Sequence, residues 1–363
     1  MKQNAHTKYS LIMEDIQRDI ISGKIKAGDQ ITSENKLCVR YNVSRHTVRK
    51  AISELIGQGY LASVHGKGTF CTERTRFEGA SHNIGVITTY ISDYIFPHVI
   101  RGVDEVLSRN GYSIILKNTG NSQSAEAKCL EDILSKNIDG LIIEPSRSDI
   151  INRNIYLYEK LDQYNIPYVF IQGIYRQLSH KPYVVLDEKY GACLATRHLL
   201  KTGRKDLLGI FKIDDYQGIE RHKGYSLALA EAGIPYDPDH VITYHTEDRK
   251  TKPAFALREL LGKGVKIDGI ISYNDQIAHV VYQELTTMGI KVPEDIAIVG
   301  YDDSFIAVNS QVPLSSVHHP KEELGRLAAN LLLDILRGKA GREQWHKVIT
   351  PELIIRESTG KLI

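Results

Sequence analysis

The sequence predicts an α+β winged helix-turn-helix domain at the N-terminus, followed by a long α/β core of two parallel-sheet lobes. Residues 1–71 combine helical periodicity with a glycine-punctuated hairpin. Residues 72–82, TERTRFEGASH, are polar and aperiodic, as in a linker. Residues 83–363 alternate short apolar runs with amphipathic stretches, which is the pattern of parallel sheets covered by helices on both faces.

Composition indicates a folded protein of more than one domain. The chain has 363 residues, of which 42% are hydrophobic and 25% charged. Its net charge of +2 is unevenly distributed, because residues 1–75 hold 12 Lys and Arg against 7 Asp and Glu, which leaves 34 against 37 elsewhere. A solvated charged surface would give a similar excess, but a basic N-terminal domain also favours an anionic partner such as nucleic acid.

We expect a cytoplasmic protein without metal or other cofactor. No run of eighteen or more apolar residues is present, and the stretch MKQNAHTKYSLIMEDIQRDI lacks the basic and then apolar order of a signal peptide. Four cysteines lie far apart without a CxxC pair, which indicates reduced thiols instead of disulfides or a zinc site: Cys38, Cys71, Cys129 and Cys193.

Three helices are predicted in the N-terminal domain. Apolar residues three and four positions apart indicate the first helix over 8–22. The motif TSEN then offers Thr32 or Ser33 as the cap of a second helix, which Asn42 ends. Ser44 caps the third helix. Its first turns include the outward residues Arg45, His46, Thr47, Arg49 and Lys50.

The segment YLASVHGKGTFCT, residues 60–72, alternates in polarity and predicts a β-hairpin. Gly66 and Gly68 allow the positive φ angles of its tip, and a tip without bulky side chains can approach DNA closely. A helix-turn-helix followed by such a wing predicts a DNA-reading domain. Arg45 and Arg49 are the predicted base readers, because a guanidinium group makes bidentate contacts with guanine.

The segment from Gly23 to Phe70 resembles the DNA-binding domain of GntR-type bacterial repressors. It carries the landmarks VSRHTVR and GKGTF, and it departs at Ala27 and Thr32, where that family usually has proline. The resemblance implies contacts with DNA phosphates or bases from the first helix, both ends of the helix-turn-helix and the wing tip. These residues are Lys8, Ser33, Glu34, Ser44, Arg45, Thr47, Arg49, His65 and Gly66.

Beyond the linker, apolar runs such as NIGVITTYI, DGLIIEP, DGIISYN and IAIVGYD predict strands. Helices are predicted between them at 97–109, 124–136, 152–164, 190–200, 218–232, 253–261, 275–288 and 320–336. More than ten strands are too many for one open sheet, so we expect two lobes with a crossover near 183–187.

Polar residues gather where the predicted strands end. They are Asp93, Tyr94, Glu144, Gln172, Asp187, Asn274, Asp275, Asp302 and His319. Any one of them could be an ordinary cap or loop residue, and Asp275 could be the N-cap of its helix. Because ligands of doubly wound sheets lie at the carboxyl ends of the strands, the group predicts a polar ligand site between the lobes.

Residues 83 to about 358 resemble the effector-binding core of LacI/GalR repressors, which has a periplasmic-binding-protein-like fold. The blocks ERHKGY, SYNDQ, VPEDIAIVGYDD and PLSSV carry the resemblance. It implies a homodimer with a sugar effector. In this reading Arg221 binds two hydroxyls, and the residues around the sugar are Glu144, Asp187, Asn274, Asp275 and Asp302. Further candidates are Tyr90, Tyr94 or Phe96 as a stacking face, with Gln172 and His319.

The fusion of these two parts is similar to the family of arabinose repressors in Gram-positive bacteria. This implies double-stranded operator DNA as one partner and L-arabinose as the effector, which is expected to release the DNA. Another pentose, a small oligosaccharide or a sugar phosphate remains an alternative. A sugar-processing enzyme is a rival class, but the chain has no glycine-rich phosphate loop, nucleophile elbow or HExxH motif. A transport-type sugar-binding protein would leave the N-terminal domain unexplained.

Overall fold

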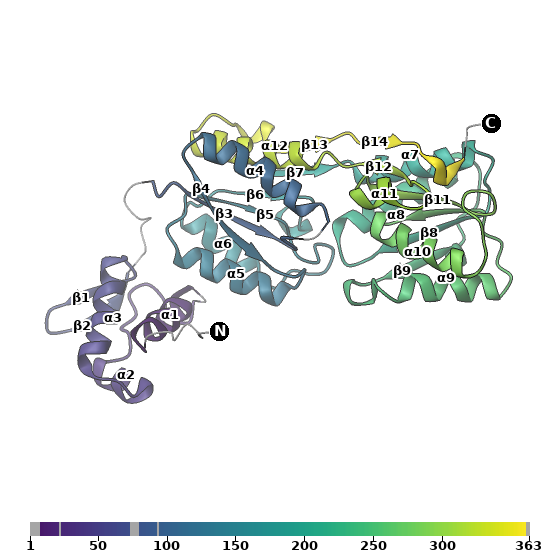
Figure 1. Cartoon of the computed structure of the whole chain (residues 1–363). Helices are drawn as coiled ribbons and strands as arrows, with labels where there is room; N and C mark the ends of the chain where they lie inside the picture. The colour runs from purple at the N-terminus through teal and green to yellow at the C-terminus, as the bar shows by residue number, and fades with distance from the viewer. Residues whose placement is uncertain (1–7, 22, 73–79, 93, 361–363) are drawn as a thin grey trace.

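The computed structural model describes residues 8–21, 23–72, 80–92 and 94–360 (Figure 1). They form a small N-terminal domain and a core of two lobes, each built on a six-stranded sheet. Most of the expected linker and the site candidate Asp93 lie outside the described residues. Within those residues, no helix combines the length and apolar character needed to cross a membrane.

The N-terminal domain has the predicted order of three helices and a hairpin. Its elements are α1 (Lys8–Ile21), α2 (Glu34–Tyr41), α3 (Arg45–Gly57), β1 (Leu61–Val64) and β2 (Gly68–Cys71). Ile12, Val48 and Leu55 are fully buried at its centre. The Ser44 hydroxyl caps α3 by accepting a hydrogen bond from the Thr47 amide, as predicted. Ser33 occupies the N-cap position of α2 but makes no capping hydrogen bond with its side chain.

The first lobe contains a fully parallel sheet with the strand order β13-β7-β6-β5-β3-β4. Its strands are β3 (Asn83–Thr88), β4 (Ser113–Asn118), β5 (Gly140–Ile143), β6 (Tyr168–Ile171), β7 (Tyr183–Leu186) and β13 (His346–Ile349). Helices α4 (Phe96–Arg109) and α12 (Lys321–Leu336) cover one face, and α5 (Gln123–Ser135) and α6 (Ile155–Gln163) cover the other.

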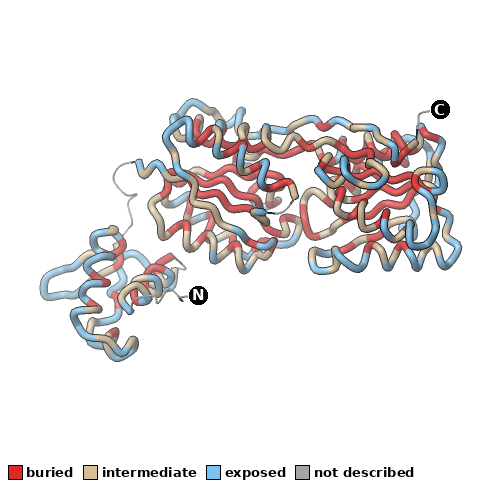
Figure 2. The backbone as a smooth tube through the Cα atoms, in the orientation of Figure 1, coloured by how far each residue is buried: buried red, intermediate tan, exposed pale blue. Residues whose placement is uncertain are grey.

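The second lobe has the strand order β14-β12-β11-β10-β8-β9, with only β14 antiparallel to its neighbour. Its strands are β8 (Leu207–Lys212), β9 (Val241–Tyr244), β10 (Gly269–Ser272), β11 (Ala297–Asp302), β12 (Ser315–His318) and β14 (Glu352–Ile354). One face carries α7 (Glu188–Lys201) and α8 (Tyr216–Glu231). The other carries α9 (Lys252–Gly262), α10 (Asp275–Thr287) and α11 (Phe305–Asn309). Figure 2 shows the strands of both sheets as buried cores between exposed helix faces.

The predicted crossover near 183–187 is the first of three. The chain passes from β7 to α7, returns from β12 to α12, and passes again from β13 to β14. Helix α12 therefore follows a strand of the second lobe but covers the sheet of the first, where Leu324, Ala328 and Leu332 are fully buried. An amphipathic pattern shows that a helix has a buried face but not which sheet lies beneath it, so the sequence could not reveal this exchange.

Candidate functional site

The start of α3 presents polar and basic side chains to solvent. Arg45, His46, Arg49 and Lys50 are exposed, whereas Val48 between them is fully buried. This division follows from the helical period, because residues three and four apart lie on the same face. The exposed face can therefore enter a DNA groove while the opposite face keeps the helix attached to the domain.

Two predicted DNA-contacting residues interact with each other. Nε of Arg49 lies 2.9 Å from Oε2 of Glu34, the first residue of α2, and both side chains are solvent-accessible. The ion pair joins the two helices of the helix-turn-helix across their turn. Lys8 joins α1 to the same turn, because its Nζ donates a hydrogen bond to the Asn42 carbonyl at 3.1 Å.

The wing tip is held against the domain by Gln30. Its Nε2 donates a hydrogen bond to the Lys67 carbonyl at 2.8 Å. Gly66 and Gly68 have φ values of 74° and 115°, as the prediction requires, and His65 beside them is exposed. Sequence reasoning did not select Lys36, Arg40 or Lys67, although these exposed basic residues lie on α2 and the wing.

A cavity of about 90 Å³ lies between the lobes, where the carboxyl ends of their strands meet. Eight of the predicted effector residues line it: Tyr90, Tyr94, Phe96, Glu144, Gln172, Arg221, Asn274 and Asp302. The first five come from the first lobe and the last three from the second. A ligand inside would therefore touch both lobes at once.

Three other predicted residues do not line the cavity. Asp187 is the N-cap of α7 and accepts a hydrogen bond from the Tyr190 amide at 2.9 Å. Asp275 is fully buried and is the first residue of α10, whose N-cap is Asn274 instead. Its carboxylate accepts hydrogen bonds from the Ser304 amide and the Ser316 hydroxyl. Strand-end position alone cannot tell a ligand contact from a helix cap or a buried support.

His319, the third of these residues, supports the cavity wall from behind. Its Nε2 lies 2.7 Å from Oε1 of Gln172, which does line the cavity, and both residues are buried. Burial lowers the pKa of His319 to about 3, so the imidazole is neutral near pH 7. His319 lies between β12 of the second lobe and α12 of the first, so the pair ties this crossover to the end of β6.

Several lining residues were missed by the sequence reasoning. Among them are Asn121, Lys212, Asp215, Thr246, Arg249 and Tyr273. Most of them lie at or just after the ends of β8, β9 and β10. The sequence feature that could have identified them is therefore the same one as before, a polar residue directly after an apolar run. The runs FKIDD and TYHTED carry that signal, but charged loop residues are common and no further pattern separated these from ordinary surface.

Arg221 is held in the cavity wall by several contacts. It is 3% exposed, and its guanidinium lies 4.8 Å from the centroid of the Tyr273 ring and 3.5 Å from that of Tyr301. Nε donates a hydrogen bond to Glu188 at 2.7 Å, Nη1 to the Tyr273 carbonyl, and Nη2 to Asp302 at 3.5 Å. A guanidinium has five N–H donors, so two remain for a ligand.

Glu144 lines the cavity from the first lobe. One carboxylate oxygen accepts hydrogen bonds from both the amide and the hydroxyl of Thr89, at 2.8 and 2.7 Å. Burial raises the pKa of Glu144 to about 7, although the two hydrogen bonds from Thr89 lower this pKa. Near neutral pH this carboxyl group can therefore either accept or donate a hydrogen bond, as a sugar hydroxyl can.

Backbone strain also gathers at the cavity. Among the described residues, nine that are not glycine have positive φ, and four of these line it: Tyr94, Asn121, Gln172 and Asp302. Such conformations cost about 1–3 kcal/mol each and persist where the surroundings impose them, often at ligand sites. Asn121 follows Gly120 in a turn, where Asn tolerates this conformation, but no residue type in the sequence signals it for Tyr94, Gln172 and Asp302.

The arrangement suits recognition of a small polar ligand. Carboxylates, amides and a guanidinium alternate with the rings of Tyr90, Phe96 and Tyr273, which can cover the C–H face of a sugar. Within the described residues, no group of three or more His, Cys, Asp and Glu side chains could hold a metal ion.

Comparisons with known proteins match both parts of the chain. The family described as "Bacterial regulatory proteins, gntR family" matches residues 8–71, and "Periplasmic binding protein-like domain" matches residues 196–359. The structure of the transcriptional regulator CelR in complex with cellobiose aligns with a TM-score of 0.70 at 27% identity, covering 87% of this chain and 91% of that one. The transcription regulator CcpA of Lactococcus lactis aligns with a TM-score of 0.67 at 30% identity, covering 79% and 100%.

Two curated relatives extend over the whole length. An arabinose metabolism transcriptional repressor of Halalkalibacterium halodurans is 40% identical over 98% of this chain and 97% of its own. A repressor of the same description from Geobacillus stearothermophilus is 36% identical over 100% of both chains. Both parts of the chain are thus matched in one continuous alignment.

The fold and these relatives define a transcriptional repressor that joins a GntR-type winged helix-turn-helix to a periplasmic-binding-protein-like core. This confirms the predicted regulator class over the enzyme alternative. More narrowly, the chain belongs to the family of arabinose metabolism transcriptional repressors.

Proposed function

We propose that this repressor acts as a homodimer on operators of arabinose-utilisation genes, and that L-arabinose bound between the lobes releases it. The observation that carries the proposal is the cavity, which collects hydrogen-bonding side chains and aromatic rings from both lobes. A ligand with hydroxyls on every side would satisfy more of these groups in the closed cleft than in an open one. As a regulator of operator DNA, the protein would act in the bacterial cytoplasm.

The size of the cavity favours a monosaccharide. One water needs about 10–15 Å³ of such volume, so about 90 Å³ has room for roughly six to nine waters. A pentose, with about ten non-hydrogen atoms, is on the scale of this space, whereas a disaccharide is about twice as large. Among the alternatives, an oligosaccharide is therefore the poorer match to a cavity of this size.

The charges of the cavity favour a neutral sugar over a sugar phosphate. Three cationic side chains line the cavity, and carboxylates balance two of them: Lys212 lies 2.7 Å from Asp215, and Arg221 is paired with Glu188. The third, Arg249, donates a hydrogen bond to the Tyr90 hydroxyl at 3.0 Å. Glu144 adds an acidic group to the same cavity. A phosphate group would lie close to these carboxylates, and the repulsion between like charges disfavours its binding.

The winged helices would bind two half-sites of one operator. Arg45 and Arg49 are proposed as base readers, and Lys8, Ser33, Glu34, Ser44, Thr47, His65 and Gly66 as positioning contacts. Because HTH dimers bind half-sites separated by about one helical turn, roughly 34–36 Å, the distance between the two domains matters. Closure of the cleft around sugar would change that distance.

Helix α11 supports the homodimer. Phe305 is 80% exposed and Val308 52% exposed on this short helix of the second lobe. Apolar side chains grouped on one surface element are typical of an interface, and a two-fold dimer would bury the same patch from each subunit.

The energetic demand on the switch is modest. A tenfold loss of operator affinity requires about 1.4 kcal/mol of coupling between the two sites. The sugar can supply this only through a difference in its affinity for the closed and open states.

Isothermal titration calorimetry of the full chain with L-arabinose tests the effector, with D-xylose, D-ribose, D-galactose and arabinose 5-phosphate as controls. We expect selective binding of L-arabinose, and its addition should release a fluorescent operator fragment in an anisotropy assay. Selective binding of the phosphate ester would instead assign the cavity to a phosphorylated sugar. Tight L-arabinose binding without operator release would contradict the proposed switch.

A further inference from the structure

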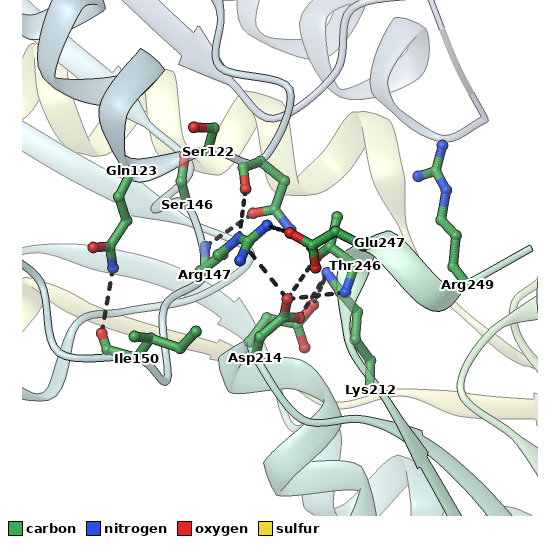
Figure 3. A network of polar contacts seen from close by, with 12 residues as sticks. Ser122, Gln123, Ser146, Arg147, Ile150, Lys212, Asp214, Thr246, Glu247 and Arg249 are labelled. Carbon is green, nitrogen blue, oxygen red and sulfur yellow. Dashed lines mark hydrogen bonds and ion pairs between the residues drawn. The ribbon is translucent and has the colours of Figure 1, made fainter. Parts of the chain in front are cut away.

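A polar network beside the cavity joins loops of the two lobes (Figure 3). It consists of Asn121 and Arg147 from the first lobe and Asp214, Thr246 and Glu247 from the second, and we call it the inter-lobe latch. Figure 3 shows Arg147 extended from its own loop toward Asp214 and Glu247. Arg147 itself does not line the cavity.

The base of the Arg147 side chain is fixed in the first lobe. Its backbone amide donates a hydrogen bond to Oδ1 of Asn121 at 2.9 Å, and its Nε donates one to the Asn121 carbonyl at 3.2 Å. The residue has φ of 47°, a conformation that residues other than glycine adopt only when their surroundings impose it. These contacts fix the loop in a conformation that directs the Arg147 side chain across the cleft.

The guanidinium reaches two carboxylates of the second lobe. Nη2 donates a hydrogen bond to Oε1 of Glu247, and Nε lies 4.0 Å from Oδ2 of Asp214. Asp214 is fully buried, with Lys212 3.4 Å away on its other side. A buried carboxylate is costly unless opposite charge compensates it, and Arg147 is part of that compensation only while the lobes are closed.

The latch shares two residues with the wall of the cavity. Asn121 and Thr246 both line it, and Nδ2 of Asn121 donates a hydrogen bond to Oγ1 of Thr246 at 2.9 Å across the cleft. The Thr246 hydroxyl in turn donates to Asp214 at 2.7 Å, and its amide donates to the same oxygen at 3.0 Å. A continuous chain of hydrogen bonds therefore runs from the cavity wall to the residues around Arg147.

We propose that Arg147 is a positioning residue for the effector response. Through Glu247 and Asp214 it holds the lobes closed, and it raises sugar affinity without touching the sugar. The apparent dissociation constant of a ligand that binds the closed state is the intrinsic one divided by the closed fraction. Other bonds also bridge the lobes, such as Arg249 to Tyr90 and Tyr216 to Ser148, so removal of the latch should shift the equilibrium without abolishing closure.

The test compares Arg147→Met with Arg147→Lys and with Arg176→Met. Arg176 forms an ion pair inside the first lobe with Asp149, which lies in the same loop as Arg147, so its variant removes an arginine from this loop's surroundings without removing a bond between the lobes. We expect Arg147→Met to weaken L-arabinose binding about 3- to 10-fold in calorimetry, Arg147→Lys to recover part of the loss, and Arg176→Met to bind normally. The preference for L-arabinose over D-galactose should stay unchanged, because Arg147 does not contact the ligand.

Hydrogen exchange of the ligand-free full chain supplies a readout that does not depend on the identity of the sugar. Loss of the latch should speed exchange in the peptide around Thr246, which lies in the second lobe and is distant in sequence from the substitution. Exchange that changes only near residue 147, or not at all, would overturn the proposal. The sugar part rests on the proposed function: if no variant binds sugar while the second-lobe exchange still changes, the effector assignment fails and the latch stands.

Discussion

Nε of Arg221 lies 2.7 Å from Oε2 of Glu188, and both side chains are buried in the second lobe. Glu188 is the first residue of α7, at the point where the chain first enters the second lobe. The pair fixes the direction of the guanidinium, so that its two unused donors stay available to the cavity. Glu188 was absent from the sequence-based candidates, because a glutamate in the first turn of a helix is an ordinary residue.

Arg221→Ala should abolish effector binding and strongly destabilise the core. The substitution removes the ligand donors and leaves Glu188 as a buried charge without its partner, which costs about 3–5 kcal/mol. Urea unfolding measures the destabilisation and calorimetry measures sugar binding. A variant that still folds should bind operator DNA but no longer respond to L-arabinose.

A double variant, Arg221→Met with Glu188→Gln, separates folding from binding. It removes both charges of this pair and should recover part of the lost stability, because Glu188 no longer remains as an unpaired charge, whereas buried Asp302 still loses its contact with Arg221. It should still fail to bind sugar. Normal induction by either the single or the double variant would remove Arg221 from the effector site.

Arg45→Ala and Arg49→Ala should each weaken specific operator binding by about 1–3 kcal/mol and relax the preference for particular bases. Both side chains are exposed in the first turns of α3, the proposed reading helix. Sugar binding should be unchanged. Anisotropy titrations with specific and scrambled DNA measure the ratio of the two affinities. Arg153→Ala, which removes an exposed arginine from the first lobe, is the control, and equal specificity in the α3 variants would contradict the base-reading role.

Lys8→Ala tests a positioning contact by a different measurement. A phosphate contact contributes about one unit to the slope of the logarithm of affinity against the logarithm of salt concentration. We expect the variant to weaken specific and scrambled DNA equally and to reduce this slope. An unchanged slope would show that the Lys8 side chain serves only the bond to Asn42.

The sequence was most informative where local rules decide the structure. Helical period, the Ser44 cap and the glycines of the wing predicted the N-terminal domain, because each of these signals acts over a few residues. Parallel strands and their polar ends likewise predicted a ligand site between the lobes.

The sequence did not predict contacts between residues that lie far apart in the chain. The side chain of Asp275 supports Ser304 and Ser316, and Arg147 reaches Glu247 a hundred positions away. No period or motif encodes such pairs, since each half is an ordinary polar residue in its own segment. The return of α12 to the first lobe could not be predicted for the same reason, because it depends on which of the two sheets has an uncovered face.

Gly102→Ala should destabilise the first lobe. Helices α4 and α12 are so close that a Cβ atom on Gly102 would lie 2.1 Å from the backbone carbonyl oxygen of Glu322. A backbone atom cannot move aside as the end of a flexible side chain can, so the overpacking should destabilise the fold by about 1–3 kcal/mol. This loss should exceed the gain of about 1 kcal/mol that alanine brings over glycine in helix propensity. Thermal unfolding measures the loss.

Gly262→Ala is the matched control. Gly262 ends α9, and a Cβ atom there would have no neighbour within 4 Å. The change should be neutral or stabilising by up to about 1 kcal/mol. Equal stability of the two variants would show that α4 and α12 can separate without cost.

Glu144 should make the stability of the core depend on pH in a defined direction. Burial raises the pKa of this carboxyl group to about 7 in the folded chain, from 4.5 as its ordinary value. Between these values the unfolded chain releases the proton while the folded chain keeps it, so stability is fully present below about pH 4.5 and is lost as pH rises through about 7. Buried Asp275, with a pKa also raised to about 7, contributes with the same sign.

Glu144→Gln tests this without emptying the site, because the amide oxygen can still accept both hydrogen bonds from Thr89. The variant cannot release a proton, so urea unfolding from about pH 5 to pH 8 should show a shallower decline than in the original chain. Asp275 leaves some of the decline in place. Glu159→Gln, an exposed carboxyl group on α6, should retain the full decline. If Glu144→Gln follows the same curve as Glu159→Gln, Glu144 is already ionised in the folded cleft and presents only acceptors to the sugar.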